Sequence, residues 1–200
     1  MVQDYSDFYD KFHGAAKTMR SALIDRLQKA APNIFHLPSE VFRTNYDRKN
    51  VPELKRLHTW DQDSALSSKP PVLFPPCVRE KGCKGYETKM FQSPEMFLLI
   101  KALLFGISSL DSEKVGGRAT YGKQWGITNI DSLPFYTIPT FALLTVFIIS
   151  EDAEFTSEGT KSKRHWEDYF DYLRLTFYRA CGSHEFPNIM RMCQEIVFSG

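Results

Sequence analysis

The sequence contains one glycine-rich motif with the spacing of a phosphate-binding loop. Residues 117–123 (GRATYGK) follow the G-x-x-x-x-G-K pattern, which ends at Lys123. In such loops backbone amides and the lysine hold phosphate groups, and a following Ser or Thr binds Mg²⁺. Here Gln124 takes that place, and the preceding residues do not read as the buried strand that such loops follow. The pattern therefore favours an ordinary glycine-rich loop, and a degenerate nucleotide-binding enzyme is the second alternative function.

The same loop alternates cationic and aromatic side chains, which is typical of surfaces that bind single-stranded nucleic acid. The alternating residues are Arg118, Tyr121, Lys123 and Trp125. On such surfaces aromatic rings stack on bases while cations meet the phosphates. Trp125 is as easily a core anchor, with Lys123 as its solvated neighbour. Because the formal net charge is only +1, a local patch would have to supply the attraction. Nucleic-acid binding is therefore the first alternative function.

Thiol and imidazole groups at two places in the chain define a candidate zinc site. The candidate ligands are Cys77, Cys83, Cys181 and His184. Four such ligands suffice for a structural zinc ion, but the five residues between the first two cysteines exceed the usual spacing of about two to four. Ordinary reduced cysteines are the simpler interpretation. Zinc is the only cofactor that the sequence indicates, and we otherwise expect none.

No set of residues has the spacing of a hydrolytic active site. The chain lacks the G-x-S-x-G and H-E-x-x-H patterns, and its five histidines are scattered singly. We assign no catalytic residue from the sequence. The balance of motifs therefore leans against an enzyme.

The elements that must position these residues are helical. Several stretches carry apolar residues at spacings of three and four, or a helix-start signal such as Ser93-Pro94-Glu95. They cover roughly residues 5–30, 93–105, 133–149, 164–180 and 187–198. We predict an all-α fold, a single globular helical bundle of about five to seven helices with a long irregular segment near residues 47–90.

The irregular segment divides one predicted domain into parts. Length favours a single domain over residues 1–200, with N-terminal helices in 1–46, an irregular arm in 47–92 and core helices in 93–200. Prolines and glycines interrupt the arm, and its best strand-like stretch is Pro71 to Phe74. Long connections of this kind are often binding segments.

The sequence also carries signals of cellular setting. The first ten residues hold three aspartates and no basic residue, so they do not resemble a secretory leader. The apolar stretch Leu133–Ile149 contains two prolines and has no cationic flank, which favours a core helix over a membrane span. Four cysteines in 200 residues are not typical of a disulfide scaffold, and we expect reduced thiols. We therefore expect an intracellular protein, cytoplasmic or nuclear, with no membrane partner.

Several short stretches together resemble a protein family. They are KALLFGISSL (Lys101–Leu110), KQWGIT in the glycine-rich loop, FIISEDAEF (Phe147–Phe155), Gly159 and YFDY (Tyr169–Tyr172). Over roughly residues 70–198 the chain is similar to uncharacterised proteins of mushroom-forming (agaricomycete) fungi, a domain of unknown function. The resemblance implies a fungal, intracellular protein. It implies no catalytic or binding residue, because the family has no assigned activity.

The leading hypothesis is a non-catalytic helical module that binds protein, either a different partner or a second copy of itself. It follows from the missing catalytic set together with an aromatic-rich chain, in which 14% of residues are Phe, Trp or Tyr, and with a long irregular arm able to lie on a partner.

Overall fold

The protein is an all-α fold, as the sequence predicts. The computed structural model describes residues 2–60, 69–82, 86–111 and 120–198, with side chains from residue 18 onward. Within these residues there is no β-strand, only one isolated bridge between Glu158 and His165. None of the described helices is both long and apolar enough to cross a membrane.

Eight α-helices lie in the described part of the chain, five of them with twelve residues or more. They are α1 (Val2–Phe35), α2 (Pro52–His58), α3 (Pro76–Lys81), α4 (Pro94–Phe105), α5 (Tyr121–Trp125), α6 (Thr137–Ile149), α7 (Trp166–Ala180) and α8 (Phe186–Val197). Short 3-10 helices occur at η1 (Ser39–Phe42), η2 (Arg48–Asn50), η4 (Pro71–Leu73), η5 (Glu87–Lys89), η6 (Ile107–Leu110) and η7 (Ile130–Ser132).

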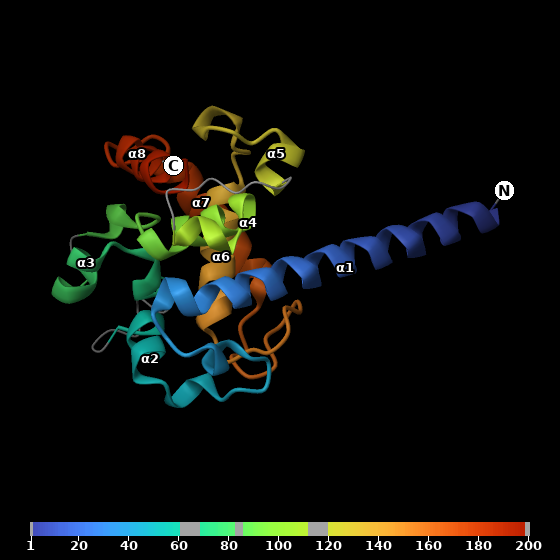
Figure 1. Ribbon diagram of the computed structural model, residues 1–200, viewed down its shortest axis with the longest axis horizontal. Helices are drawn as coiled ribbons and strands as arrows, with labels where there is room; N and C mark the ends of the chain where they lie inside the picture. Colours follow the sequence, from blue (N-terminus) through green and yellow to red (C-terminus); the bar gives the residue numbers. More distant parts are fainter. Residues whose placement is uncertain (1, 61–68, 83–85, 112–119, 199–200) are drawn as a thin grey trace.

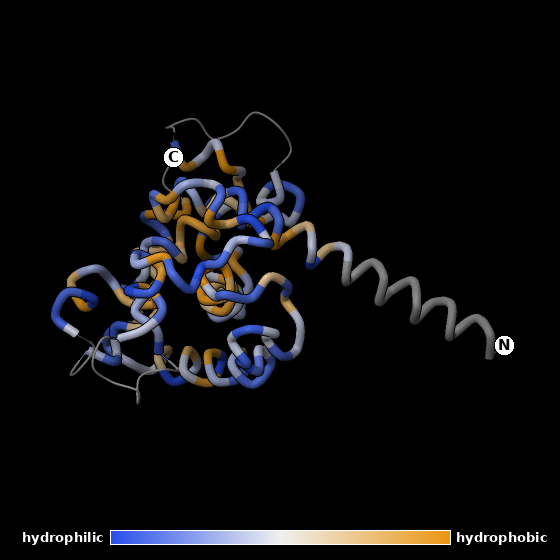
Figure 2. The backbone as a smooth tube through the Cα atoms, turned by 90° about the horizontal axis from the view of Figure 1, so that it is seen from below, coloured by the Kyte–Doolittle hydropathy of each residue, from blue (hydrophilic) through white to orange (hydrophobic). Residues whose placement is uncertain are grey.

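Helices α4 and α6 form the centre of the body, with α1, α7 and α8 around them (Figure 1). Helix α4 begins where the sequence predicts, because Ser93 Oγ accepts the Met96 amide at 3.3 Å and Pro94 occupies the first turn. It ends at Gly106, whose φ of 96° favours glycine. Hydrophobic segments gather inside the body in Figure 2. Helices α4 and α6 carry apolar residues on nearly every side, as expected for helices that other elements surround.

Helix α1 is longer than its sequence pattern predicts. The pattern predicts a helix over roughly residues 5–30, yet the helix includes Pro32 and continues to Phe35. Pro32 removes one backbone hydrogen bond, but burial of apolar residues on both sides of it, such as Ala31 and Ile34, favours the helical continuation despite that cost. His36 then turns the chain at φ 54°. Towards its N-terminus the helix extends well beyond the body (Figure 1).

The described residues of the irregular segment form short helices and turns that pack into the body. Pro71–Leu73, read as strand-like in the sequence, is a 3-10 helix. That prediction was wrong because the two adjacent prolines Pro70 and Pro71 fix φ near the helical value and withhold ladder donors. Phe74 and Phe91 are fully buried. The described residues of this segment therefore contribute to the core instead of lying free.

Candidate functional site

The cationic and aromatic residues of the glycine-rich loop lie on and before α5. Thr120 Oγ1 caps this helix by accepting the Lys123 amide at 3.4 Å. The Tyr121 and Trp125 rings stack at 4.8 Å and 4° between planes, and the Arg26 guanidinium lies 4.5 Å above Tyr121. Trp125 is 49% exposed, so it is not a core anchor. Arg118, the remaining residue of this set, lies outside the described residues.

Packing accounts for the second glycine of the phosphate-loop pattern. Gly122 is buried against the end of α4, where an added Cβ would lie 2.9 Å from the Phe105 ring and 3.0 Å from the Ile127 carbonyl oxygen. Close approach of backbone to a neighbour is a common reason for glycine. Lys123 is exposed. Gly117 lies in the part of the chain that the structure does not describe, so this half of the pattern stays a prediction.

The candidate zinc ligands have different surroundings. Cys77 is exposed on α3, and His184 is 82% exposed beside Glu185. Cys181 is half-buried after α7, where its thiol contacts the Phe177 carbonyl oxygen at 3.3 Å. Cys83 falls outside the described residues. No cluster of three or more metal-ligating side chains occurs among the residues with described positions, and zinc binding stays a prediction.

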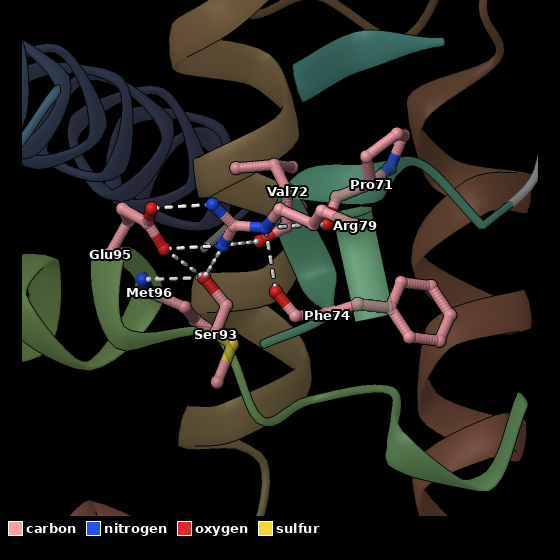
Figure 3. Close-up of polar contacts among 7 residues, drawn as sticks. All are labelled: Pro71, Val72, Phe74, Arg79, Ser93, Glu95 and Met96. Atoms are coloured by element: carbon pink, nitrogen blue, oxygen red, sulfur yellow. Dashed lines mark hydrogen bonds and ion pairs between the residues drawn. The ribbon is translucent and has the colours of Figure 1, made fainter. Parts of the chain in front are cut away.

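A half-buried ion pair anchors the irregular segment to α4 (Figure 3). Arg79 Nη1 donates to Glu95 Oε1 at 2.6 Å, while Arg79 Nε donates to the carbonyl oxygens of Phe74 at 2.8 Å and Pro71 at 3.1 Å. Burial works to raise the pKa of Glu95, but the hydrogen bonds and charge of Arg79 outweigh it and hold that pKa below its usual value. The pair ties η4 and α3 to the first turn of α4, so its role is architectural.

A basic pocket opens between η2 and α2 on one side and the loop after α6 on the other, with a volume of about 490 Å³. Five cationic side chains and one carboxylate contribute to its lining. They are Arg48, Lys49, Lys55, Lys161, Arg164 and Glu151. We call this cavity the basic pocket. Its positive charge comes from segments about one hundred residues apart in the sequence.

Arg48 holds the two sides of the basic pocket together. It is 3% exposed, and its Nη1 donates to the carbonyl oxygens of Ser150 at 2.9 Å and Asp152 at 3.2 Å. Its other donors reach the carbonyl oxygens of Val41, Phe42 and Arg43. Burial lowers the pKa of Arg48 and the negative charge of Asp152 opposes that change. The guanidinium thus joins η1 and η2 to the end of α6.

Asp152 shapes the loop that forms the other wall. Its Oδ1 accepts the backbone amides of Lys161 at 2.9 Å and Ser162 at 3.0 Å, and its Oδ2 accepts the Ser162 hydroxyl. Burial acts to raise the pKa of Asp152, but the hydrogen bonds from Ser162 and Lys161 lower it overall. The hydrogen bonds of this ionised carboxylate therefore hold the loop of residues 152–162 in its conformation.

His58 is the buried polar group of the basic pocket that lacks a partner. Its Nε2 atom is buried and has no hydrogen bond among the described residues. Burial, followed by the nearby charge of Arg164, lowers the pKa of His58 to about 4 against the opposing charge of Asp152. The Arg164 guanidinium lies 4.4 Å above the Tyr169 ring. His58 and Arg164 thus line the same cavity.

Comparisons with known proteins return no match from family models, from curated proteins or from solved structures. The likeness to proteins of mushroom-forming fungi therefore stays a prediction. No functional residue is transferred to this chain from a relative.

Sequence reasoning missed the basic pocket altogether. Its residues fall in two separate segments, 48–59 and 149–164, neither of which has a recognisable ligand motif. One usable signal was present, since Lys161 to Arg164 is a basic run and Arg48-Lys49 lies in a second basic stretch. Nothing local indicates that the two runs meet. By contrast, the predicted residues Tyr121 and Trp125 do lie together, because they are four apart on one short helix.

Proposed function

We propose that the protein is a non-catalytic helical module that associates with a second copy of itself through the N-terminal half of α1. Only the C-terminal half of this 34-residue helix is embedded in the body, where Leu27 and Ala30 are fully buried. Residues 18–22 are each exposed, and Met19 is 67% exposed. The projecting helix of Figure 1 is the observation that carries the proposal.

The apolar spacing of α1 continues in the sequence towards its N-terminus. Sequence positions 8, 12, 15 and 19 hold Phe, Phe, Ala and Met, at the helical spacing that also includes the buried Leu27. Residues 2–22 span about 30 Å at about 1.5 Å per residue. A helix of that length with one apolar face is only marginally stable alone in water, and a partner that covers the face stabilises it.

Charge favours an antiparallel second copy as that partner. Residues 2–10 contain three aspartates and no cation, whereas residues 11–20 contain Lys11, Lys17 and Arg20 and no carboxylate. An antiparallel pair centred between positions 13 and 14 sets position 8 opposite 19 and position 12 opposite 15 of the other copy. It also sets the acidic stretch of one helix beside the basic stretch of the other, within about one Debye length. A parallel pair would set aspartates beside aspartates.

Two-fold symmetry is compatible with the rest of the fold. In the antiparallel arrangement the two bodies lie at opposite ends of the paired helices, and the same surface is used by both copies, as in other two-fold dimers. About twenty residues of each helix are in contact, which is a small interface. A dimer that dissociates in the micromolar range is therefore expected.

The test is the mass of the full chain in solution, measured by analytical ultracentrifugation over a range of concentrations. We expect a reversible dimer of twice 23.1 kDa at concentrations of about 100 µM, in line with a small interface. The double variant F8D/F12D places two charges on the apolar face and should be monomeric. The control S6D/H13D adds the same charge to the opposite face of the helix and should dimerise. A wild-type chain that is monomeric throughout this range overturns the proposal.

A second candidate function, binding of single-stranded nucleic acid, is favoured by one observation on α5. Trp125 is 49% exposed while its ring rests on Tyr121, so the ring is held in place with part of its surface accessible to a base. We expect oligonucleotides to quench tryptophan fluorescence, with affinity falling steeply as salt rises. Trp125→Ala should abolish the effect, and Tyr178→Ala, which removes an exposed ring on α7, should leave it intact. Unquenched fluorescence removes this candidate.

A further inference from the structure

We propose that the basic pocket is a binding site for the phosphoryl group of a phosphorylated small molecule. Its volume of about 490 Å³ falls within the range of about 300–1,000 Å³ typical of small-molecule sites. A phosphate ion alone fills only part of such a volume. The site is separate from α1, so the proposal is independent of self-association.

The charge of the lining selects an anion. Five of the lining side chains are cationic and Glu151 is the single carboxylate among them. Asp152, although close, is turned into its own loop, where the amides of Lys161 and Ser162 and the Ser162 hydroxyl occupy its oxygens. The charge of Asp152 still acts on Arg48 and His58, but the five cations outnumber the two carboxylates, so the lining keeps a net positive charge. Focused positive potential in a concave site raises the local concentration of anionic ligands.

Arg164 is the side chain best placed to bind the phosphoryl oxygens. Its guanidinium is held over the Tyr169 ring at 4.4 Å and over the Trp166 ring at 5.7 Å, which limits its rotation. No hydrogen bond joins that guanidinium to any residue that the structure describes. Arg48 differs, because backbone carbonyl groups already accept all of its described bonds. Arg164 thus offers a preorganised planar fork, the geometry that suits bidentate phosphate recognition.

His58 supplies the second, independent indication of a ligand. Its buried Nε2 has no partner among the described residues, and buried polar atoms in native proteins nearly always have one. The imidazole and Arg164 line the same cavity. An anion oxygen between them would accept a hydrogen bond from the imidazole and offset the repulsion that Arg164 exerts on its charged form. Lys49, Lys55 and Lys161 are exposed, and they add charge at the margin of the pocket.

Isothermal titration calorimetry on the full chain tests the proposal with three probes: inorganic phosphate, pyrophosphate and a sugar phosphate. The unphosphorylated sugar is the matched negative probe. We expect the phosphorylated probes to bind and the neutral sugar not to bind. Tighter binding of the sugar phosphate than of inorganic phosphate would show that the remaining volume contacts the organic part. No heat from any phosphorylated probe at concentrations up to about 10 mM overturns the proposal, since that corresponds to binding weaker than about −3 kcal/mol.

Variants locate the binding. Arg164→Gln should weaken it by about tenfold or more. The double variant K55Q/K161Q changes only exposed side chains, so it should fold normally and also weaken binding. The control Arg56→Gln removes a cation next to Lys55 that does not line the cavity, and it should bind as the wild type does. Binding that is equally strong in all of these variants lies elsewhere and overturns the proposal.

An NMR titration of the histidine ring protons gives a readout that a purely structural role would not move. Bound phosphoryl oxygens beside the imidazole should raise the pKa of His58 from about 4, because they favour its charged form. His58 signals that do not respond to saturating pyrophosphate contradict the placement of the anion in this pocket.

Discussion

Gly159 lies so close to Asp152 that a Cβ on residue 159 would come 2.0 Å from the carboxylate oxygen Oδ2 and 2.3 Å from Ser162 Oγ. Only glycine allows the chain to pass behind the carboxylate while Asp152 binds the amides of Lys161 and Ser162. The same loop forms one wall of the basic pocket, and Arg48 fastens its first residues to η2. One glycine thus sets the geometry of the wall that presents Arg164.

We expect Gly159→Ala to lower the free energy of unfolding by about 2–3 kcal/mol, because the added methyl group must displace the Asp152 carboxylate or the loop. Gly182→Ala is the matched control, since its Cβ would meet nothing closer than 3.9 Å. Urea denaturation measures both. Equal stability of the two variants would show that the loop accommodates a methyl group freely.

Replacement of Arg48 by lysine should destabilise the protein by about 3 kcal/mol. An ammonium group cannot span the five carbonyl oxygens that the planar guanidinium reaches, so several buried acceptors lose their partners. Arg43→Lys, at an exposed position beside it, should change stability by less than about 0.5 kcal/mol. Thermal unfolding compares the two variants. An Arg48→Lys variant as stable as the wild type would contradict the stabilising role of the Arg48 hydrogen bonds.

The ion pair between Arg79 and Glu95 should make stability depend on acid pH. The folded-state pKa of Glu95 lies below its unfolded value, so its contribution is complete above the unfolded pKa, near 4.5, and is lost as pH falls through the folded pKa. Asp152, whose pKa is also lowered, acts in the same direction. We expect Glu95→Gln to be less stable than the wild type near neutral pH. Its free energy of unfolding should fall less than that of the wild type as the pH is lowered. Denaturant midpoints between about pH 3 and 6 measure this.

A control variant is needed to separate a general loss of stability from a change in the pH dependence of stability. Val72→Ala removes buried methyl groups and leaves all titrating groups in place. It should therefore be less stable than the wild type by a constant amount at each pH. If Glu95→Gln kept the same pH dependence as Val72→Ala, the pair would contribute nothing to acid sensitivity.

His58 should remain neutral in the folded protein down to about pH 5, because burial and the charge of Arg164 lower its pKa from 6.5 to about 4. The unfolded chain takes up this proton first, so stability falls as pH decreases from about 6.5 towards 4. His58→Gln should reduce that loss. Proton NMR of the imidazole signals, without phosphate, checks the pKa directly, and a His58 titration near 6.5 contradicts the prediction.

Local features of the fold were predictable from the sequence. Ser93-Pro94 predicts the start of α4 because a cap hydroxyl and an N-terminal proline act within one turn. A continuous apolar run predicts α6, and apolar residues at helical spacing predict α7, both of which are local features of the chain. The apolar spacing predicts an end of α1 near residue 30, but the helix runs to Phe35, because burial of Ile34 outweighs the local cost of Pro32. Errors of this kind arise where tertiary contacts oppose a local preference.

The candidate sites also differ in whether local sequence or tertiary contacts bring their residues together. Tyr121 and Trp125 stack because they are four positions apart on one helix, and the local sequence alone determines that they are neighbours. Arg48 meets the carbonyl oxygen of Ser150 across 102 positions of sequence. No local rule fixes such a meeting, because it depends on how α2, α6 and the loop after α6 pack together. The sequence by itself thus determined an all-α chain, most of its helices and one aromatic stack. Only the tertiary structure decided where the cations converge, since burial and packing bring distant segments together.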